Sequence, residues 1–113
     1  MNIQIIGMKN CNDSKKAVRF FKERSINIHF RDLVEKGLSK GELENICRVI
    51  DPDELINTES KQYKKRGLEF MVFNIKDELL DDPLIIKTPI VRNGSKATVG
   101  VESDVWADWI KEN

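Results

Sequence analysis

Cys11 is the residue of this sequence best placed to carry chemistry, because it follows a polar loop and directly precedes a predicted helix. The thiolate is the reactive form of cysteine, and its population at neutral pH grows when the thiol pKa falls below its usual value of about 8.5. The unpaired N–H groups at a helix start favour the thiolate, and Lys9, Lys15 and Lys16 are nearby in the sequence. One interpretation is therefore an activated nucleophile, and the other is an ordinary free cysteine in a loop.

A second thiol is not found beside Cys11 in the sequence. Ser14 occupies the position of the second cysteine in a C-x-x-C pair, so a local disulfide cannot form. Cys47 lies among apolar residues at helical spacing, which is typical of a small core residue. Two cysteines and the single His29 do not make a zinc ligand set, and no bound metal is expected. A disulfide on Cys11 must be resolved either by Cys47 or, as we expect, by an external thiol.

The first part of the sequence predicts a β-α-β unit that would position Cys11. Residues 2–6 are rich in β-branched apolar side chains and end at Gly7, which favours a short strand. Typical N-cap residues then begin a segment, 12–24, with apolar side chains at helical spacing. In residues 26–31 apolar and polar side chains alternate, as in a strand with one buried face.

Short helices are predicted in the middle of the chain, at residues 39–50, 53–56, 58–63 and 74–80. Ser39 and Glu42 have the S-x-x-E spacing of a capping box. Pro52 suits the first position of the second helix. Thr58 is expected to cap the third helix, and Gly67 to end it.

The last part of the sequence predicts strands again, followed by one helix. An apolar run at 84–86 predicts a strand that continues to residue 91 with Pro89 inside it. Asn93-Gly94 is a strong signal for a hairpin turn, and residues 96–99 form the expected returning strand. Ser103 is expected to cap a final helix, whose apolar stripe contains two tryptophans.

Length and composition limit the classes of protein that this sequence can encode. The 113 residues suit a single domain, 1–113, with a core of residues 1–31 and 84–113 and a mainly helical insert at 32–83. Lys+Arg and Asp+Glu both number 19, so the balanced charge gives no general attraction to nucleic acid. The apolar runs are shorter than the roughly 20 residues that cross a membrane, and no signal peptide is recognised. The expected location is therefore the cytoplasm.

Several short motifs occur in an order that is more informative than any of them alone. They are Gly7 to Cys11, Lys15-Lys16-Ala17, Thr88 to Val91, Asn93-Gly94, and Val99-Gly100 before the tryptophan-bearing helix. In this arrangement the sequence resembles the ArsC/Spx family, which comprises glutaredoxin-linked arsenate reductases, their YffB-like relatives and the redox regulator Spx. The resemblance covers nearly the whole chain and implies an α/β thioredoxin-like fold with a small mixed sheet.

The resemblance also implies a site around one catalytic cysteine, Cys11. A cis proline, Pro89, is expected beside it, presenting the backbone of Thr88 to a bound thiol partner. The residues expected to bind the substrate or the thiol partner are Lys9, Asn10, Asn12, Ser14, Thr88 and Pro89. No bound cofactor is implied, and glutathione is the expected co-substrate, with glutaredoxin or a thioredoxin-type protein as the alternative thiol donor.

Arginines that hold an oxyanion in arsenate reductases are missing at the matching positions of this sequence. These positions carry Thr88, Asn57 with the acidic Glu59, and the pair Val99-Gly100. Lys87, Arg92 and Lys96 are expected to be solvated strand residues, and Arg31 to pair locally with Asp32. The sequence thus predicts a thiol-disulfide oxidoreductase that does not reduce arsenate. Two alternatives remain open: a Spx-like regulator that binds RNA polymerase, and a structural relic of the fold.

Overall fold

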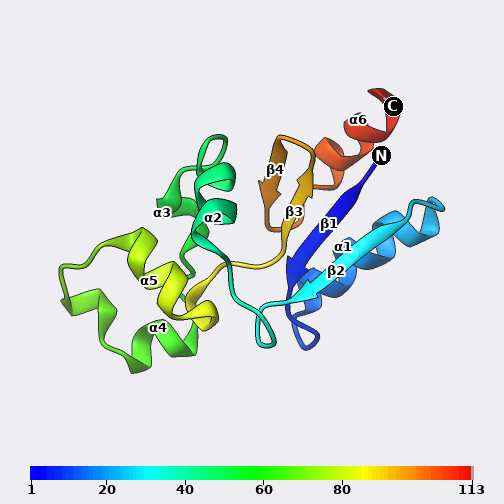
Figure 1. Ribbon diagram of the computed structural model, residues 1–113. Helices are drawn as coiled ribbons and strands as arrows, with labels where there is room; N and C mark the ends of the chain where they lie inside the picture. The colour runs from blue at the N-terminus through cyan, green and yellow to red at the C-terminus, as the bar shows by residue number, and fades with distance from the viewer. Residues whose placement is uncertain (113) are drawn as a thin grey trace.

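Four strands form one mixed sheet, in the order β2-β1-β3-β4, in the computed structural model, which describes residues 1–112 (Figure 1). The central strand β1 (Ile3–Gly7) runs parallel to β2 (Ile28–Asp32) and antiparallel to β3 (Ile90–Asn93). The hairpin strand β4 (Lys96–Val99) completes the sheet. The element order is β-α-β, helices, then β-β-α, which confirms the expected α/β thioredoxin-like fold class.

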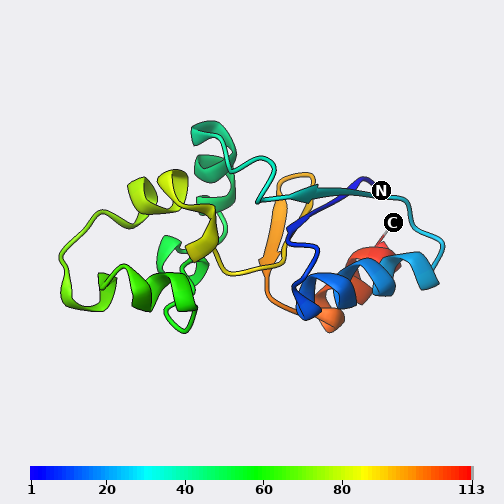
Figure 2. The ribbon, with the colours of Figure 1, turned by 90° about the horizontal axis from the view of Figure 1, so that it is seen from below.

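Two helices, α1 (Asn12–Glu23) and α6 (Ser103–Glu112), cover one face of the sheet (Figure 2). Phe21 and Trp106 are fully buried between these helices and the sheet, with ring centroids 5.4 Å apart. The indole N–H of Trp106 donates a hydrogen bond to the Thr98 hydroxyl at 2.8 Å. The apolar stripe of the last helix is thus part of the core. The hydrogen bond to Thr98 satisfies the polar N–H group of the buried indole.

The middle of the chain folds into short helices that lie beside the sheet (Figure 1). They are α2 (Lys40–Cys47), α3 (Pro52–Leu55), α4 (Lys61–Lys65), the 3-10 turn η1 (Leu68–Phe70), α5 (Ile75–Asp81) and the 3-10 turn η2 (Pro83–Ile85). Their buried side chains form a second core cluster, to which the sheet contributes Ile6 and Ile90. The insert therefore has a core cluster distinct from the one beneath α1 and α6, and it joins the sheet through Ile6 and Ile90.

The predicted strand over residues 84–91 is wrong in its first half. Asp82 accepts a hydrogen bond from the Leu84 N–H, and Pro83 follows as the first residue of the 3-10 turn η2. An acidic cap followed by proline starts a helical turn, and this local preference wins over the apolar run. Ile86 makes one isolated antiparallel bridge with Ile56, and the sheet strand β3 begins only at Ile90.

Some predicted boundaries also shift by a few residues. Ser60, not Thr58, caps α4 by accepting a hydrogen bond from the Tyr63 N–H. The hairpin loop is Gly94-Ser95, one residue later than expected, because Asn93 still pairs with Lys96. Gly94 has a φ of 60°, as the first central residue of a type II′ turn requires. The capping box of α2 is confirmed as predicted.

Candidate functional site

Cys11 is the N-cap residue of α1, at the end of a short loop that leaves β1. Its N–H donates to the Met8 carbonyl at 3.0 Å, and its own carbonyl accepts the first helical hydrogen bond, from Lys15, at 3.1 Å. With φ −88° and ψ 120° the residue is extended, and its side chain does not itself cap the helix. The half-buried thiol is therefore free to face groups from another element.

Thr88 supplies that neighbouring group from the other end of the chain. Its hydroxyl donates a hydrogen bond to Cys11 Sγ, with 3.2 Å between Oγ1 and Sγ. The two residues meet because β3 pairs with β1, and Thr88 lies just before β3. The Thr88–Pro89 peptide bond is cis, as the resemblance implied, and Pro89 is buried.

Ser14 lies beneath this pair rather than on the surface. Only 1% of the residue is exposed, and its hydroxyl accepts a hydrogen bond from the Met8 N–H at 3.3 Å. Its contact with a substrate or thiol partner stays a prediction, and in the structure its hydroxyl stabilises the loop that carries Cys11.

Gly7 allows α1 to approach β1 this closely. A Cβ atom at Gly7 would lie 2.3 Å from Ser14 Oγ and 2.9 Å from Ser14 Cβ. From the sequence, Gly7 was predicted to end the first strand and to begin the motif that leads to Cys11. The available signal was a glycine directly after the strand and seven residues before a small polar residue in the first turn of the helix.

The shift of the Cys11 pKa comes from burial and hydrogen bonds rather than from the neighbouring lysines. Burial of the thiol acts to raise its pKa, but hydrogen bonds from the Ser14 and Thr88 side chains and from the Ser14 and Asp13 backbone lower the pKa of Cys11 below its ordinary value. Lys9 instead pairs with Glu35 at 3.3 Å, and Lys16 with Asp13 at 3.8 Å. The direction of the pKa shift agrees with the prediction, and the backbone hydrogen bonds come from the helix start, but no lysine among the described residues contributes to the shift.

The thiol pKa of the second cysteine, Cys47, shifts in the opposite direction. Burial is the main cause that raises the pKa of Cys47, with a smaller contribution from Asp51 and a smaller opposing one from Lys76. Cys47 packs against the core cluster of the insert, as its sequence pattern predicted. A thiol with a raised pKa is a poor nucleophile at neutral pH.

Replacing Thr88 by valine tests the origin of the low thiol pKa. We expect Thr88→Val to raise the pKa of Cys11, because the thiolate loses one hydrogen bond while the side-chain volume is retained. Hydrogen bonds to charged groups are worth about 1.5–3 kcal/mol, so alkylation of Cys11 at pH 7 should slow by about tenfold or more. The measurement is the iodoacetamide rate against pH in a Cys47→Ser background.

Thr58→Val is the matched control for this experiment, since Thr58 is exposed in the insert and its substitution should leave the rate unchanged. An unchanged rate profile in Thr88→Val would show that the hydroxyl does not stabilise the thiolate.

The three cationic side chains that were expected to be solvated strand residues are engaged elsewhere or exposed. Arg92 donates to Gln4 at 3.3 Å and lies 4.0 Å from Glu42, while Lys96 pairs with Glu112 at 2.8 Å. Lys87 is exposed just before Thr88. Among residues 1–112, no arginine or lysine donates a hydrogen bond to Cys11 Sγ.

The remaining predicted binding residues surround the thiol on the surface. Asn10 and Asn12 are exposed on either side of Cys11, and Lys9 is exposed with its ammonium turned to Glu35. No group of three or more His, Cys, Asp or Glu side chains in the described part of the chain is arranged to hold a metal ion. Among the same residues, no helix has the length and apolarity that crossing a bilayer demands.

Comparisons with known proteins find a family model and relatives that span most of the chain. A family model described as the ArsC family matches residues 6–109. The global transcriptional regulator Spx 2 of Oceanobacillus iheyensis is 29% identical over 109 residues, which cover 92% of this chain and 80% of the relative. An uncharacterized protein of Haemophilus influenzae is 30% identical over 104 residues, covering 87% of this chain and 90% of its own.

Solved structures share the fold at lower sequence identity. A protein described as YFFB superposes with a TM-score of 0.84 and 22% identity, over 94% of this chain and 96% of the other. An arsenate reductase from Vibrio cholerae superposes with a TM-score of 0.81 and 17% identity, over 96% and 97% of the two chains. These likenesses establish that the fold is shared.

Proposed function

Since the chain belongs to the ArsC family, whose model matches residues 6–109, we propose that it is a thiol-disulfide oxidoreductase with Cys11 as its single nucleophile. The observation that carries the proposal is the Thr88 hydroxyl, which donates to Cys11 Sγ at 3.2 Å across the two ends of the chain. Together with Ser14 it favours the thiolate, the form that attacks a disulfide.

The proposed reaction has two exchange steps. The Cys11 thiolate attacks one sulfur of a substrate disulfide, a new S–S bond forms, and the released substrate thiolate takes up a proton from water. A glutathione thiolate then attacks the mixed disulfide, which regenerates the Cys11 thiolate and leaves the two external thiols joined as a disulfide. The electrons thus come from glutathione or from a glutaredoxin or thioredoxin-type donor.

An external thiol suits this site better than Cys47. Ser14 replaces the local partner, and Cys47 packs in the insert core with a raised pKa. The resolving step therefore belongs to glutathione or a small thiol protein in this proposal.

The test measures deglutathionylation of a small peptide by the purified protein with glutathione as reductant. We expect Cys11→Ser to fall to the uncatalysed background, and the matched variant Cys47→Ser to keep the wild-type rate. Equal rates for wild type and Cys11→Ser would contradict the proposal. A large loss in Cys47→Ser with normal folding would make Cys47 the resolving thiol.

Arsenate is not the substrate that this site favours. Each charge-assisted hydrogen bond to an oxyanion is worth roughly 1.5–3 kcal/mol, and the three positions that would supply arginines carry other residues. We expect negligible arsenate turnover with glutathione and glutaredoxin under conditions where the peptide disulfide reacts. Robust arsenate turnover would instead mean that Lys9, Lys87 or Arg92 moves to the thiol.

A second candidate function is a regulator that binds RNA polymerase. It is favoured by the 29% identity to a protein named as a global transcriptional regulator and by the absence of the oxyanion arginines from the sequence. The discriminating experiment is retention of purified RNA polymerase by wild type and by Cys11→Ala. Equal retention, with no reaction of the wild type toward disulfides, would favour the regulator over the oxidoreductase.

A further inference from the structure

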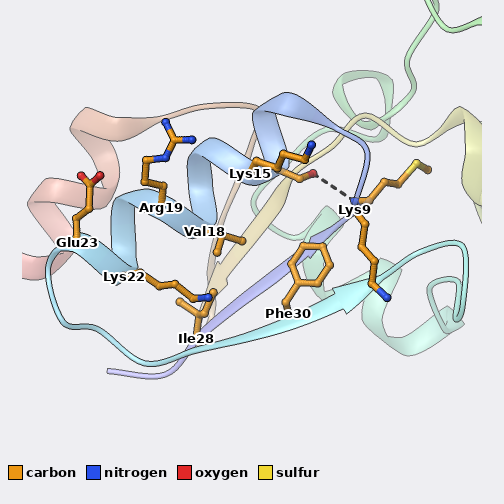
Figure 3. A pocket seen from close by; sticks show the side chains of 10 residues that line it. Lys9, Lys15, Val18, Arg19, Lys22, Glu23, Ile28 and Phe30 are labelled. Atoms are coloured by element: carbon orange, nitrogen blue, oxygen red, sulfur yellow. Dashed lines mark hydrogen bonds between the residues drawn. The ribbon is translucent and has the colours of Figure 1, made fainter.

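A groove of about 630 Å³ runs between α1 and the edge strand β2 (Figure 3). Four apolar side chains line it: Met8, Val18, Ile28 and Phe30. All four are only partly buried, so this surface is accessible. It begins beside the Cys11 loop and extends along the helix toward Lys22.

The rim of the groove is strongly cationic. Lys15, Arg19 and Lys22 are four and three residues apart on α1, which places them along one side of the helix. None of the three forms an ion pair within residues 1–112, where Glu23 is the single acidic residue lining the groove. Lys9, at the Cys11 end, already pairs with Glu35 on the surface. The rim therefore presents three unmatched positive charges beside an apolar floor.

The position of β2 determines what shape of ligand can enter. β2 is the outermost strand of the sheet, and its one neighbour is β1. An edge strand offers backbone N–H and C=O groups to an extended chain, while pockets beside it receive alternate side chains. An apolar floor, a cationic rim and an open strand edge together match an extended peptide that presents both apolar and acidic side chains on the face toward α1.

We infer that this groove binds an acidic, amphipathic segment of a protein partner in extended conformation along β2. The apolar side chains of the segment contact Val18, Ile28 and Phe30, and its carboxylates face Lys15, Arg19 and Lys22. Cys11 does not line the groove, so binding does not rely on the proposed thiol chemistry. Nucleic acid fits less well, since the floor offers apolar carbon rather than donors for base edges.

The probe is a fluorescein-labelled ten-residue peptide in which Leu and Glu take turns at every second position with Thr between them, so that both face α1 in an extended chain. It is titrated with the full-length protein and followed by fluorescence anisotropy. The variant is Arg19→Glu/Lys22→Glu, and the matched control is Lys61→Glu/Lys65→Glu, which makes the same charge change on exposed residues of α4. We expect the first variant to bind at least about tenfold more weakly and the control to bind like wild type. Binding should also weaken as salt is raised, because the rim charges are exposed.

Folding and chemistry are monitored separately. Circular dichroism melting shows whether α1 survives the charge reversal, and a second variant, Arg19→Gln/Lys22→Gln, should give a smaller loss if charge is the cause. Cys11→Ser should bind the peptide as wild type does, so a failure of the oxidoreductase proposal leaves this result intact. Unchanged affinity in the folded Arg19→Glu/Lys22→Glu protein would overturn the inference. Equal affinity for a Lys-Leu peptide, or displacement of the probe by a single-stranded RNA oligonucleotide at lower concentration, would also overturn it.

Discussion

A Gly7→Ala variant should lose about 3 kcal/mol of its free energy of unfolding, which is at the upper end of the cost of overpacking a core. The added Cβ would meet Ser14 Oγ at 2.3 Å and Ser14 Cβ at 2.9 Å, and both partners are buried. Ser14 is a short side chain fixed in the first turn of α1, so the helix itself must move away from β1. The same movement would break the Met8–Ser14 hydrogen bond and raise the pKa of Cys11.

Gly41→Ala is the matched control for this prediction. Gly41 lies inside α2, and a Cβ there would have open space around it. Alanine is favoured over glycine in a helix by about 0.5–1 kcal/mol, so this variant should be slightly more stable than wild type. Urea unfolding of both variants provides the comparison. A Gly7→Ala protein within about 0.5 kcal/mol of wild type would mean that α1 tolerates a different approach to β1.

The second large effect is expected at Glu42, which neutralises a mostly buried arginine. Arg31 Nη1 lies 2.5 Å from Glu42 Oε2, and the two side chains are 12% and 22% exposed. The Nε and Nη2 atoms of Arg31 are buried and have no hydrogen-bond partner among residues 1–112. Removing the carboxylate would leave a buried guanidinium uncompensated, so Glu42→Ala should cost about 3 kcal/mol.

The same pair predicts how stability depends on pH. Burial acts to raise the pKa of Glu42, but hydrogen bonds from Arg31 and Ser39 and the charge of Arg31 lower it from 4.5 to about 2. Because the folded-state pKa is the lower one, the stabilisation is complete above the unfolded pKa and is lost as pH falls from about 4.5 toward 2.

Unfolding free energies from pH 7 down to pH 2 provide the test. Glu42→Gln should flatten the loss of stability below about pH 4.5 relative to wild type. Glu112→Gln should behave like wild type, because the Lys96–Glu112 pair is exposed and such pairs contribute little. A wild-type acid profile in Glu42→Gln would show that another carboxylate dominates.

Local sequence signals predicted much of the fold. Strand alternation in residues 26–31, the capping box at Ser39 and the position of Cys11 before a helix are properties of neighbouring residues, and the structure retains them. The 84–91 strand failed because an apolar run fits a buried 3-10 turn as well as a strand. The acidic cap at Asp82 before Pro83 was the local signal for that turn. The bridge between Ile56 and Ile86 joins distant parts of the chain and could not be read from neighbouring residues.

Single residues of the candidate site could be predicted from the sequence, whereas contacts between residues of different elements could not. The cysteine was found from its position, whereas the close approach of Gly7 to Ser14 is visible only when β1 and α1 are packed together. Arg31 was expected to pair with Asp32 but pairs with Glu42, because alternate strand residues face opposite sides of a sheet. Asp32 instead accepts a hydrogen bond from the Val34 N–H.

The 77-residue separation between Cys11 and Thr88 has a consequence for biosynthesis. A chain made from its N-terminus exposes the cysteine early, and contacts between distant segments form late in folding. Until β3 has been translated and joined to β1, the nascent protein carries a thiol without its threonine partner. The part of the thiolate stabilisation that Thr88 provides is thus acquired only with the completed sheet, and the alkylation rate of Cys11 on stalled ribosomes of increasing chain length should change at that point.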